Sequence, residues 1–222
     1  MSLPAFGDRS ITAYTLLTIE QLAPDSVNKT ALVRYLGAGL RANTPCTELR
    51  TILRALARQR QPQSYLEIGV RRGWSLAQVV AECPRVDVTA CDSWVAGYGG
   101  VANPGAQFVR DELARVAPQW QGQIEFMEGS SRDFLPELVR QGRHYDLITI
   151  DGDHTAAGAR ADLRDGLALL ACGGALVMDD LIDTADGGGS LLQTWRDVQA
   201  DFPGFVWHEL AGLVPVGVAE HA

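Results

Sequence analysis

The chain has 222 residues, of which 46% are hydrophobic and 21% charged, enough for one globular domain with a sizeable core. Its formal net charge of −8 makes nucleic acid and anionic membranes poor partners, so a small-molecule partner fits better. No apolar run reaches the roughly 18 residues of a membrane span, and no basic-then-apolar leader is evident. We therefore expect a cytoplasmic protein whose four cysteines stay reduced, since their spacing matches no zinc or redox motif.

The N-terminal part of the chain carries helical rather than strand signals. Apolar residues recur at helical spacing over 47–60 and predict an amphipathic helix there, with weaker helices over about 11–23 and 29–40. We interpret residues 1–60 as a helical cap that belongs to the same domain as residues 61–222. These helices are also plausible contacts in a homo-oligomer.

From residue 64 onward, short apolar runs alternate with helical stretches. Strands are predicted at 64–68, 86–91, 123–127, 146–150 and 175–178. Helices are predicted at about 73–82, 106–117, 133–140, 155–170 and 190–201, with Gly173-Gly174 ending the fourth. The chain closes with extended runs at 205–210 and 213–219. Five β-α alternations predict a parallel sheet with helices on both faces, and the closing hairpin requires an antiparallel strand.

The first predicted strand runs into a glycine loop, Glu67-Ile68-Gly69-Val70-Arg71-Arg72-Gly73. Gly69 permits a tight turn and close approach of a ligand, and Gly73 lets the following helix begin close to the strand. The loop lacks the Gly-x-Gly-x-x-Gly spacing of dinucleotide sites, and Glu67 would repel a pyrophosphate. A cofactor that carries an ammonium and a sulfonium fits better, although a purely structural strand-to-helix turn remains the alternative.

Polar residues follow the next two strands as well. Asp92 ends the second strand, where a carboxylate can accept both hydroxyls of a ribose, or can simply cap the following turn. Ser130 and Ser131 follow the third strand. Their small polar groups could contact an adenine edge, but either serine could equally be a helix N-cap.

The runs 65–75, 145–154 and 173–180, together with Asp92, resemble class I S-adenosylmethionine-dependent methyltransferases. They are most similar to the small bacterial group related to catechol-type, macrolide-sugar and cephalosporin-pathway O-methyltransferases, over about residues 60–220. The resemblance implies a three-layer, Rossmann-like α/β fold with a seven-stranded sheet in the order 3-2-1-4-5-7-6, strand 7 antiparallel. It implies S-adenosylmethionine as cofactor, with the binding residues Glu67, Gly69, Gly73, Asp92, Ser130, Ser131 and Asp151.

Carboxylates also end the fourth and fifth strands, at Asp151 and at Asp179-Asp180. Neighbouring strands lie about 4.8 Å apart, so these groups would converge and repel one another. A divalent hard cation relieves that repulsion, and Mg²⁺ prefers such oxygen ligands. Metal-dependent relatives place ligands at these strand ends, which implies Asp151, Asp179 and Asp180 here. A metal-free acidic pocket is the alternative, in which Asp151 binds the cofactor amine or orients His154.

His154 and Asp151 are the predicted catalytic residues. Methyl transfer is an in-line displacement in which a hydroxyl acceptor must lose its proton. Catechol-type enzymes use a lysine near this strand end, whereas the only lysine here is Lys29. An unperturbed histidine pKa near 6.5 suits a general base, although His154 could instead cap the next helix.

The leading hypothesis is thus a Mg²⁺-assisted O-methyltransferase for a small hydroxylated metabolite. A metal-free N- or O-methyltransferase and a non-catalytic cofactor-binding protein are the alternatives. Residues 94–105 are predicted to form a glycine-rich loop at the rim of the site, and Trp94, Tyr98 and Trp195 could line a substrate pocket or serve in packing.

Overall fold

The computed structural model describes residues 6, 8–24, 28–97, 100–182 and 189–221. By their internal contacts, these residues form two compact units that the chain enters more than once. One unit contains the helices α1 to α5, and the other contains the whole β-sheet with α6, α7 and α8.

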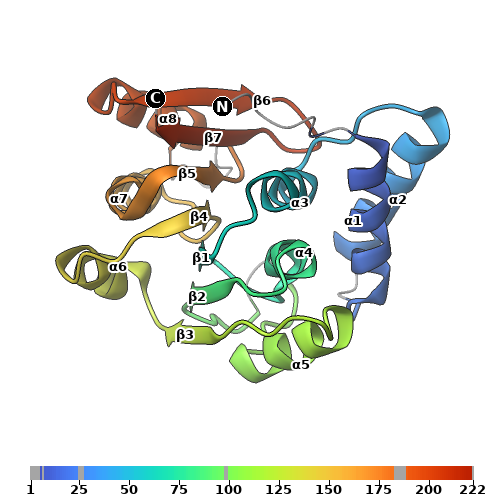
Figure 1. The fold of residues 1–222 in the computed structure, drawn as a ribbon. Helices are drawn as coiled ribbons and strands as arrows, with labels where there is room; N and C mark the ends of the chain where they lie inside the picture. Colours follow the sequence, from blue (N-terminus) through green and yellow to red (C-terminus); the bar gives the residue numbers. More distant parts are fainter. Residues whose placement is uncertain (1–5, 7, 25–27, 98–99, 183–188, 222) are drawn as a thin grey trace. The chain divides into compact units, whose positions relative to one another are not determined.

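The sheet has seven strands in the order β3-β2-β1-β4-β5-β7-β6 (Figure 1). The strands are β1 Ser64–Ile68, β2 Asp87–Asp92, β3 Ile124–Glu128, β4 Tyr145–Ile150, β5 Leu170–Met178, β6 Phe205–Leu210 and β7 Val216–His221. The first five pair in parallel, and β7 pairs antiparallel with both β5 and β6. The predicted Rossmann-like strand order, with its antiparallel seventh strand, is confirmed. Because β1 lies between β2 and β4 and runs parallel to both, the carboxyl ends of these three strands lie side by side.

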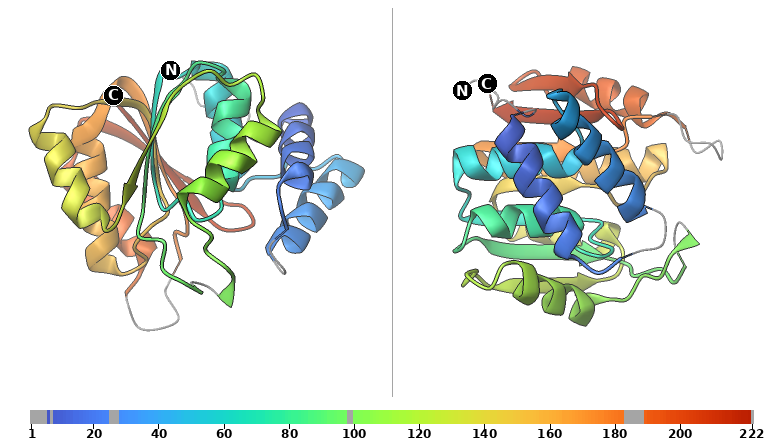
Figure 2. Two further views of the ribbon diagram at one scale, coloured as in Figure 1. Left: turned by 90° about the horizontal axis from the view of Figure 1, so that it is seen from below. Right: turned by 90° about the vertical axis from the view of Figure 1, so that its right-hand side faces the viewer.

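Three helices of the sheet unit, α6 Ser131–Arg140, α7 Ala156–Leu169 and α8 Leu191–Asp201, cover one face of the sheet (Figure 2). Their apolar faces pack with alternate strand residues such as Leu66, Ile148 and Leu176 into one hydrophobic core. The α7 helix packs against both α6 and α8, and it begins close to the end of β4 because only a short connection separates Ile150 from Ala156.

The junction between α7 and β5 differs from the prediction. The helix ends at Leu169 and β5 begins at once with Leu170, which pairs with Tyr145. The register then shifts before Leu147 pairs with Ala175, so Gly173 and Gly174 lie in an irregular part of β5. Gly173 has a φ of 79°, which glycine adopts without strain. The two glycines thus serve a strand irregularity, and the prediction that they end the helix was wrong.

The helical unit consists of α1 Arg9–Gln21, α2 Asn28–Ala42, α3 Leu49–Arg60, α4 Trp74–Glu82 and α5 Ala106–Val116. A buried ion pair holds α3 to α4, because the Arg54 guanidinium contacts a Glu82 carboxylate oxygen at 2.5 Å and is only 3% exposed. Arg54 also donates to Gln78 at 2.9 Å and to Thr18 of α1 at 2.7 Å. The single lysine, Lys29, donates to two backbone carbonyls at the end of α1. Its role there is to satisfy a helix terminus.

No helix in the described part of the chain is long and apolar enough to cross a membrane.

Candidate active site

Hydrogen bonds between strand ends fix the first half of the glycine loop. The Gly69 amide donates to the Cys91 carbonyl at 2.9 Å, and the Asp151 amide donates to the Ile68 carbonyl at 2.8 Å. Gly69 has a φ of 88°, and a Cβ there would lie 1.9 Å from the Asp151 carbonyl oxygen. Only glycine therefore allows β1 to turn against the end of β4.

Gly73 is required by a different neighbour, the side chain of Val109. It precedes α4 as its N-cap with a φ of 72°, and a Cβ there would lie 2.8 Å from a methyl group of Val109 on α5. Glycine at this position thus permits close packing of α4 on α5 and leaves the amides of the first turn of α4 without a side-chain cap.

Asp92 is the last residue of β2, where the sequence predicts it. One of its carboxylate oxygens accepts a hydrogen bond from the Val70 amide at 2.8 Å, so Asp92 orders the glycine loop. Ser130 is the N-cap of α6, with its hydroxyl accepting from the Arg132 amide, and Ser131 is the first helical residue. The capping alternative thus holds for Ser130. The Gly129 amide donates to the Asp92 carbonyl and joins the two strand ends.

Glu67 lies deeper than its sequence position suggests. Its side chain is fully buried, and the Tyr65 hydroxyl donates to its carboxylate at 2.6 Å. Burial in a low-dielectric interior strengthens the electric field of an ionised carboxylate at this position.

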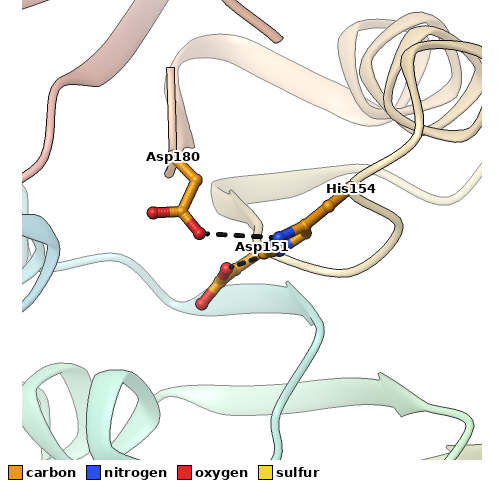
Figure 3. Close-up of side chains that lie close together, drawn as sticks. All are labelled: Asp151, His154 and Asp180. Atoms are coloured by element: carbon orange, nitrogen blue, oxygen red, sulfur yellow. Dashed lines mark ion pairs between the residues drawn. The ribbon is translucent and has the colours of Figure 1, made fainter. Parts of the chain in front are cut away.

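Three side chains at the ends of β4 and β5 converge. Figure 3 shows the His154 imidazole between the carboxylates of Asp151 and Asp180, with its Nε2 3.4 Å from the first and its Nδ1 3.6 Å from the second. Their potential ligand atoms all lie within 4.8 Å of one another, and each residue is partly exposed. A ligand or solvent can therefore reach this cluster.

The carboxylates change the acidity of the histidine. The hydrogen bond with Asp151 raises the pKa of His154 above 6.5, and the charges of Asp151, Asp180 and Asp179 add to this against the opposing effect of burial. The two carboxylates thus favour the protonated form of the imidazole.

Backbone geometry presents Asp180 to this cluster. Asp180 has a φ of 55°, in the left-handed region that non-glycine residues seldom occupy. Its neighbour Asp179 is 7% exposed, and the Asp179 amide donates to the Ile150 carbonyl. Of the two predicted aspartates, Asp180 therefore lies beside Asp151. Within the described part of the chain, the side chains that could hold a metal ion together are those of Asp151, His154 and Asp180, and Asp179 is not one of them.

Comparison with known proteins decides the family. The family model described as a methyltransferase domain matches residues 66–181, more than half of the chain. The chain belongs to this methyltransferase family. No curated protein matches the sequence of this chain.

Solved structures share its fold at low sequence identity. A proposed O-methyltransferase from Klebsiella pneumoniae is 21% identical with a TM-score of 0.61, over 96% of this chain and 98% of the other. The O-methyltransferase from Bacillus cereus in complex with S-adenosylhomocysteine is 18% identical with a TM-score of 0.59, over 96% and 99% of the two chains. TomG from Streptomyces achromogenes, in complex with S-adenosylmethionine, is 19% identical with a TM-score of 0.56 over the whole of both chains. The resemblance to class I methyltransferases is thereby confirmed.

Sequence reasoning missed one ionisable residue of this methyltransferase. Asp162 of α7 is 1% exposed, and neither carboxylate oxygen makes a hydrogen bond of normal geometry within the described residues. Burial raises the pKa of Asp162 from 3.8 to about 6, and the Ser131 hydroxyl offsets only part of this effect. The burial of Asp162 could have been predicted from the helical spacing. Asp162 lies three residues after Ala159 and four before Gly166, both buried, and therefore on the apolar face of the helix.

The aromatic residues predicted to line a substrate pocket do not share one role. Trp195 is fully buried in the core, with its ring against Gly217 and edge-on to Trp207, so its role is packing. Trp94 has a φ of 49° at the start of the 94–105 loop, and Tyr98 lies outside the described residues.

Proposed function

We propose that the protein is an S-adenosylmethionine-dependent O-methyltransferase for a small hydroxylated molecule. The observation that carries this proposal is the convergence of Asp151, His154 and Asp180 at the end of the sheet, beside the turn of the glycine loop. Solved structures of the same fold that bind S-adenosylmethionine or its demethylated product support the choice of cofactor.

The proposed cofactor residues are those at the loop and at the adjacent strand ends. Asp92 offers a carboxylate for the ribose hydroxyls, and Ser130 and Ser131 lie where β3 passes into α6. Gly69 and Gly73 provide close approach and uncapped helix amides, Glu67 provides buried negative charge, and Asp151 offers an acceptor for the ammonium group.

The cluster suits a hard divalent cation. Two partly exposed carboxylates and an imidazole, whose ligand atoms lie within 4.8 Å of one another, are compatible with an Mg²⁺ site that keeps several waters. Asp151 and Asp180 would hold the ion, with Asp179 as the further ligand predicted from the sequence. Bound there, the cation would lower the pKa of an acceptor hydroxyl.

His154 is the proposed general base. In its neutral form the imidazole can accept the proton of the acceptor hydroxyl, and the two flanking carboxylates then stabilise the imidazolium that forms. The ring nitrogens lie 3.4 Å from Asp151 and 3.6 Å from Asp180, close enough for both carboxylates to stabilise the imidazolium by charge.

Calorimetry with S-adenosylhomocysteine tests the cofactor, and release of that product over a panel of small phenols and sugars tests the reaction. We expect His154→Gln to lower kcat by about 10²–10⁴-fold without weakening cofactor binding. The exposed His144→Gln is the matched control and should leave both unchanged. Equal activity of His154→Gln and the control would refute the base assignment.

Metal dependence is a separate measurement. Loss of activity in EDTA, restored by Mg²⁺, is the expected result. Full activity in EDTA would favour a metal-free N- or O-methyltransferase. Tight cofactor binding without turnover of any acceptor would favour a non-catalytic binding protein.

A further inference from the structure

Three polar side chains are buried together where β1 leads into the glycine loop. Tyr65 and Glu67 lie two residues apart on one face of β1, and Thr149 is the β4 partner of Glu67. Each has an exposed fraction of 0%. Strand alternation places them on the face opposite Leu66 and Ile68, which belong to the apolar core with α6 to α8. Burial of three such groups is costly unless they satisfy one another.

Their hydrogen bonds have one consistent direction. The Tyr65 hydroxyl lies 2.6 Å from a Glu67 carboxylate oxygen and 2.8 Å from the Thr149 hydroxyl. An ionised carboxylate can only accept, so the single Tyr65 proton is donated to Glu67. Thr149 must then donate to Tyr65. The two hydroxyl dipoles line up toward the carboxylate and reinforce each other.

This arrangement keeps the negative charge on Glu67. Burial and the neighbouring Glu67 charge raise the pKa of Tyr65 well above 10, so the tyrosine retains the proton that it donates. Burial favours the protonated form of a carboxyl group, and the hydrogen bond from Tyr65 opposes that effect at Glu67.

We propose that Tyr65, supported by Thr149, is a positioning residue that maintains the Glu67 carboxylate as a buried negative charge selecting the ammonium group at the amino-acid end of S-adenosylmethionine. This role rests on the proposed function. Glu67 precedes the turn at Gly69 by two residues, so its field acts on whatever occupies that turn. A purely structural tyrosine would tie β1 to β4 without distinguishing charged ligands from neutral ones.

Two ligands separate these roles. S-Adenosylhomocysteine carries the charged amino-acid part, whereas 5′-methylthioadenosine has the same adenosine without it. Calorimetry on the full chain should show that the wild type prefers S-adenosylhomocysteine. We expect Tyr65→Phe to weaken S-adenosylhomocysteine by about tenfold and 5′-methylthioadenosine by less than about twofold, because a hydrogen bond to a charged group is lost.

A double-mutant cycle with Glu67→Gln tests whether Tyr65 acts through Glu67. Glu67→Gln should itself reduce the preference for the charged ligand, and Tyr65→Phe should then add no further loss. Thr149→Val provides a second test should Tyr65→Phe not fold, and we expect it to weaken S-adenosylhomocysteine selectively by about threefold. Binding of 5′-methylthioadenosine reports in each variant that the site is folded.

Equal loss of both ligands in Tyr65→Phe, or a Tyr65→Phe effect that persists in the Glu67→Gln background, would overturn the positioning role. A wild-type protein that binds S-adenosylhomocysteine no better than 5′-methylthioadenosine would overturn it while leaving the proposed function standing. A wild-type protein that binds neither ligand would overturn both.

Discussion

The buried Asp162 carboxyl should make the stability of the protein depend on pH in an unusual direction. In the folded chain its pKa is about 6, against an ordinary value of 3.8. The folded state therefore binds the proton more tightly than the unfolded state does. Stability is highest when Asp162 is protonated in both states, falls as pH rises from 3.8 to about 6, and stays low above that.

The magnitude follows from the shift. The rise of about 2 in the pKa corresponds to about 3 kcal/mol in the free energy of unfolding. Roughly half of this stabilisation is lost between pH 5 and pH 8. Asp162→Asn removes the titration while nearly preserving the shape of the side chain. As pH rises from 5 to 8, we expect the free energy of unfolding of Asp162→Asn to increase by about 1.5 kcal/mol relative to that of the wild type. The constant cost of burying the amide cancels in that comparison.

Urea unfolding, followed by tryptophan fluorescence at pH 5 and pH 8, measures the difference for both proteins. The exposed Asp111→Asn variant, which removes one carboxylate from α5, corrects for the general effect of a lost charge. A stability difference between Asp162→Asn and wild type that does not change with pH would refute the reasoning, since the buried charge would then not be the source of the cost.

Three further changes have definite expected outcomes. Asp180→Asn should lower the affinity for Mg²⁺ at least tenfold in a calorimetric titration while keeping the fold, because asparagine tolerates the left-handed backbone; unchanged affinity would exclude Asp180 as a ligand. Glu82→Gln should destabilise the protein by about 3 kcal/mol, because it leaves the buried Arg54 charge poorly compensated, and an unchanged Tm would contradict this. Gly69→Ala should abolish S-adenosylhomocysteine binding or folding, since its Cβ would collide with the Asp151 carbonyl; a fully active variant would show that the turn can relax.

Much of the sheet could be predicted because its strands are short apolar runs between turn residues. The 205–210 run coincides with β6, and the 64–68 run coincides with β1. The start of β5 could not be predicted, because the chain changes from helix at Leu169 to strand at Leu170 without a glycine, proline or other turn residue between them. The glycine pair after it has the same sequence pattern as a helix C-terminus but occupies a strand irregularity.

The cluster at the sheet end was predicted only in part. Sequence placed Asp151 and Asp180 at the ends of neighbouring strands, and topology brings them together with His154. Which of the two adjacent aspartates faces the histidine depends on the backbone angles of a single residue, Asp180. No sequence pattern reports such an angle, since asparagine and aspartate adopt left-handed conformations only in some contexts.

The sequence by itself determined most of the strands, the glycine turn and the carboxyl-end location of the acidic residues, because hydrophobic periodicity and glycine requirements are local properties. The strand order came from the resemblance to a known family, since pairing between distant strands is not a local property. Only the tertiary structure showed that Glu67 is buried under Tyr65, that Asp162 is an ionisable group within the core, and that Trp195 is a packing residue. Burial depends on neighbours far apart in the chain. The acidity of Asp162 is therefore set by contacts that become defined only when the strands and helices pack.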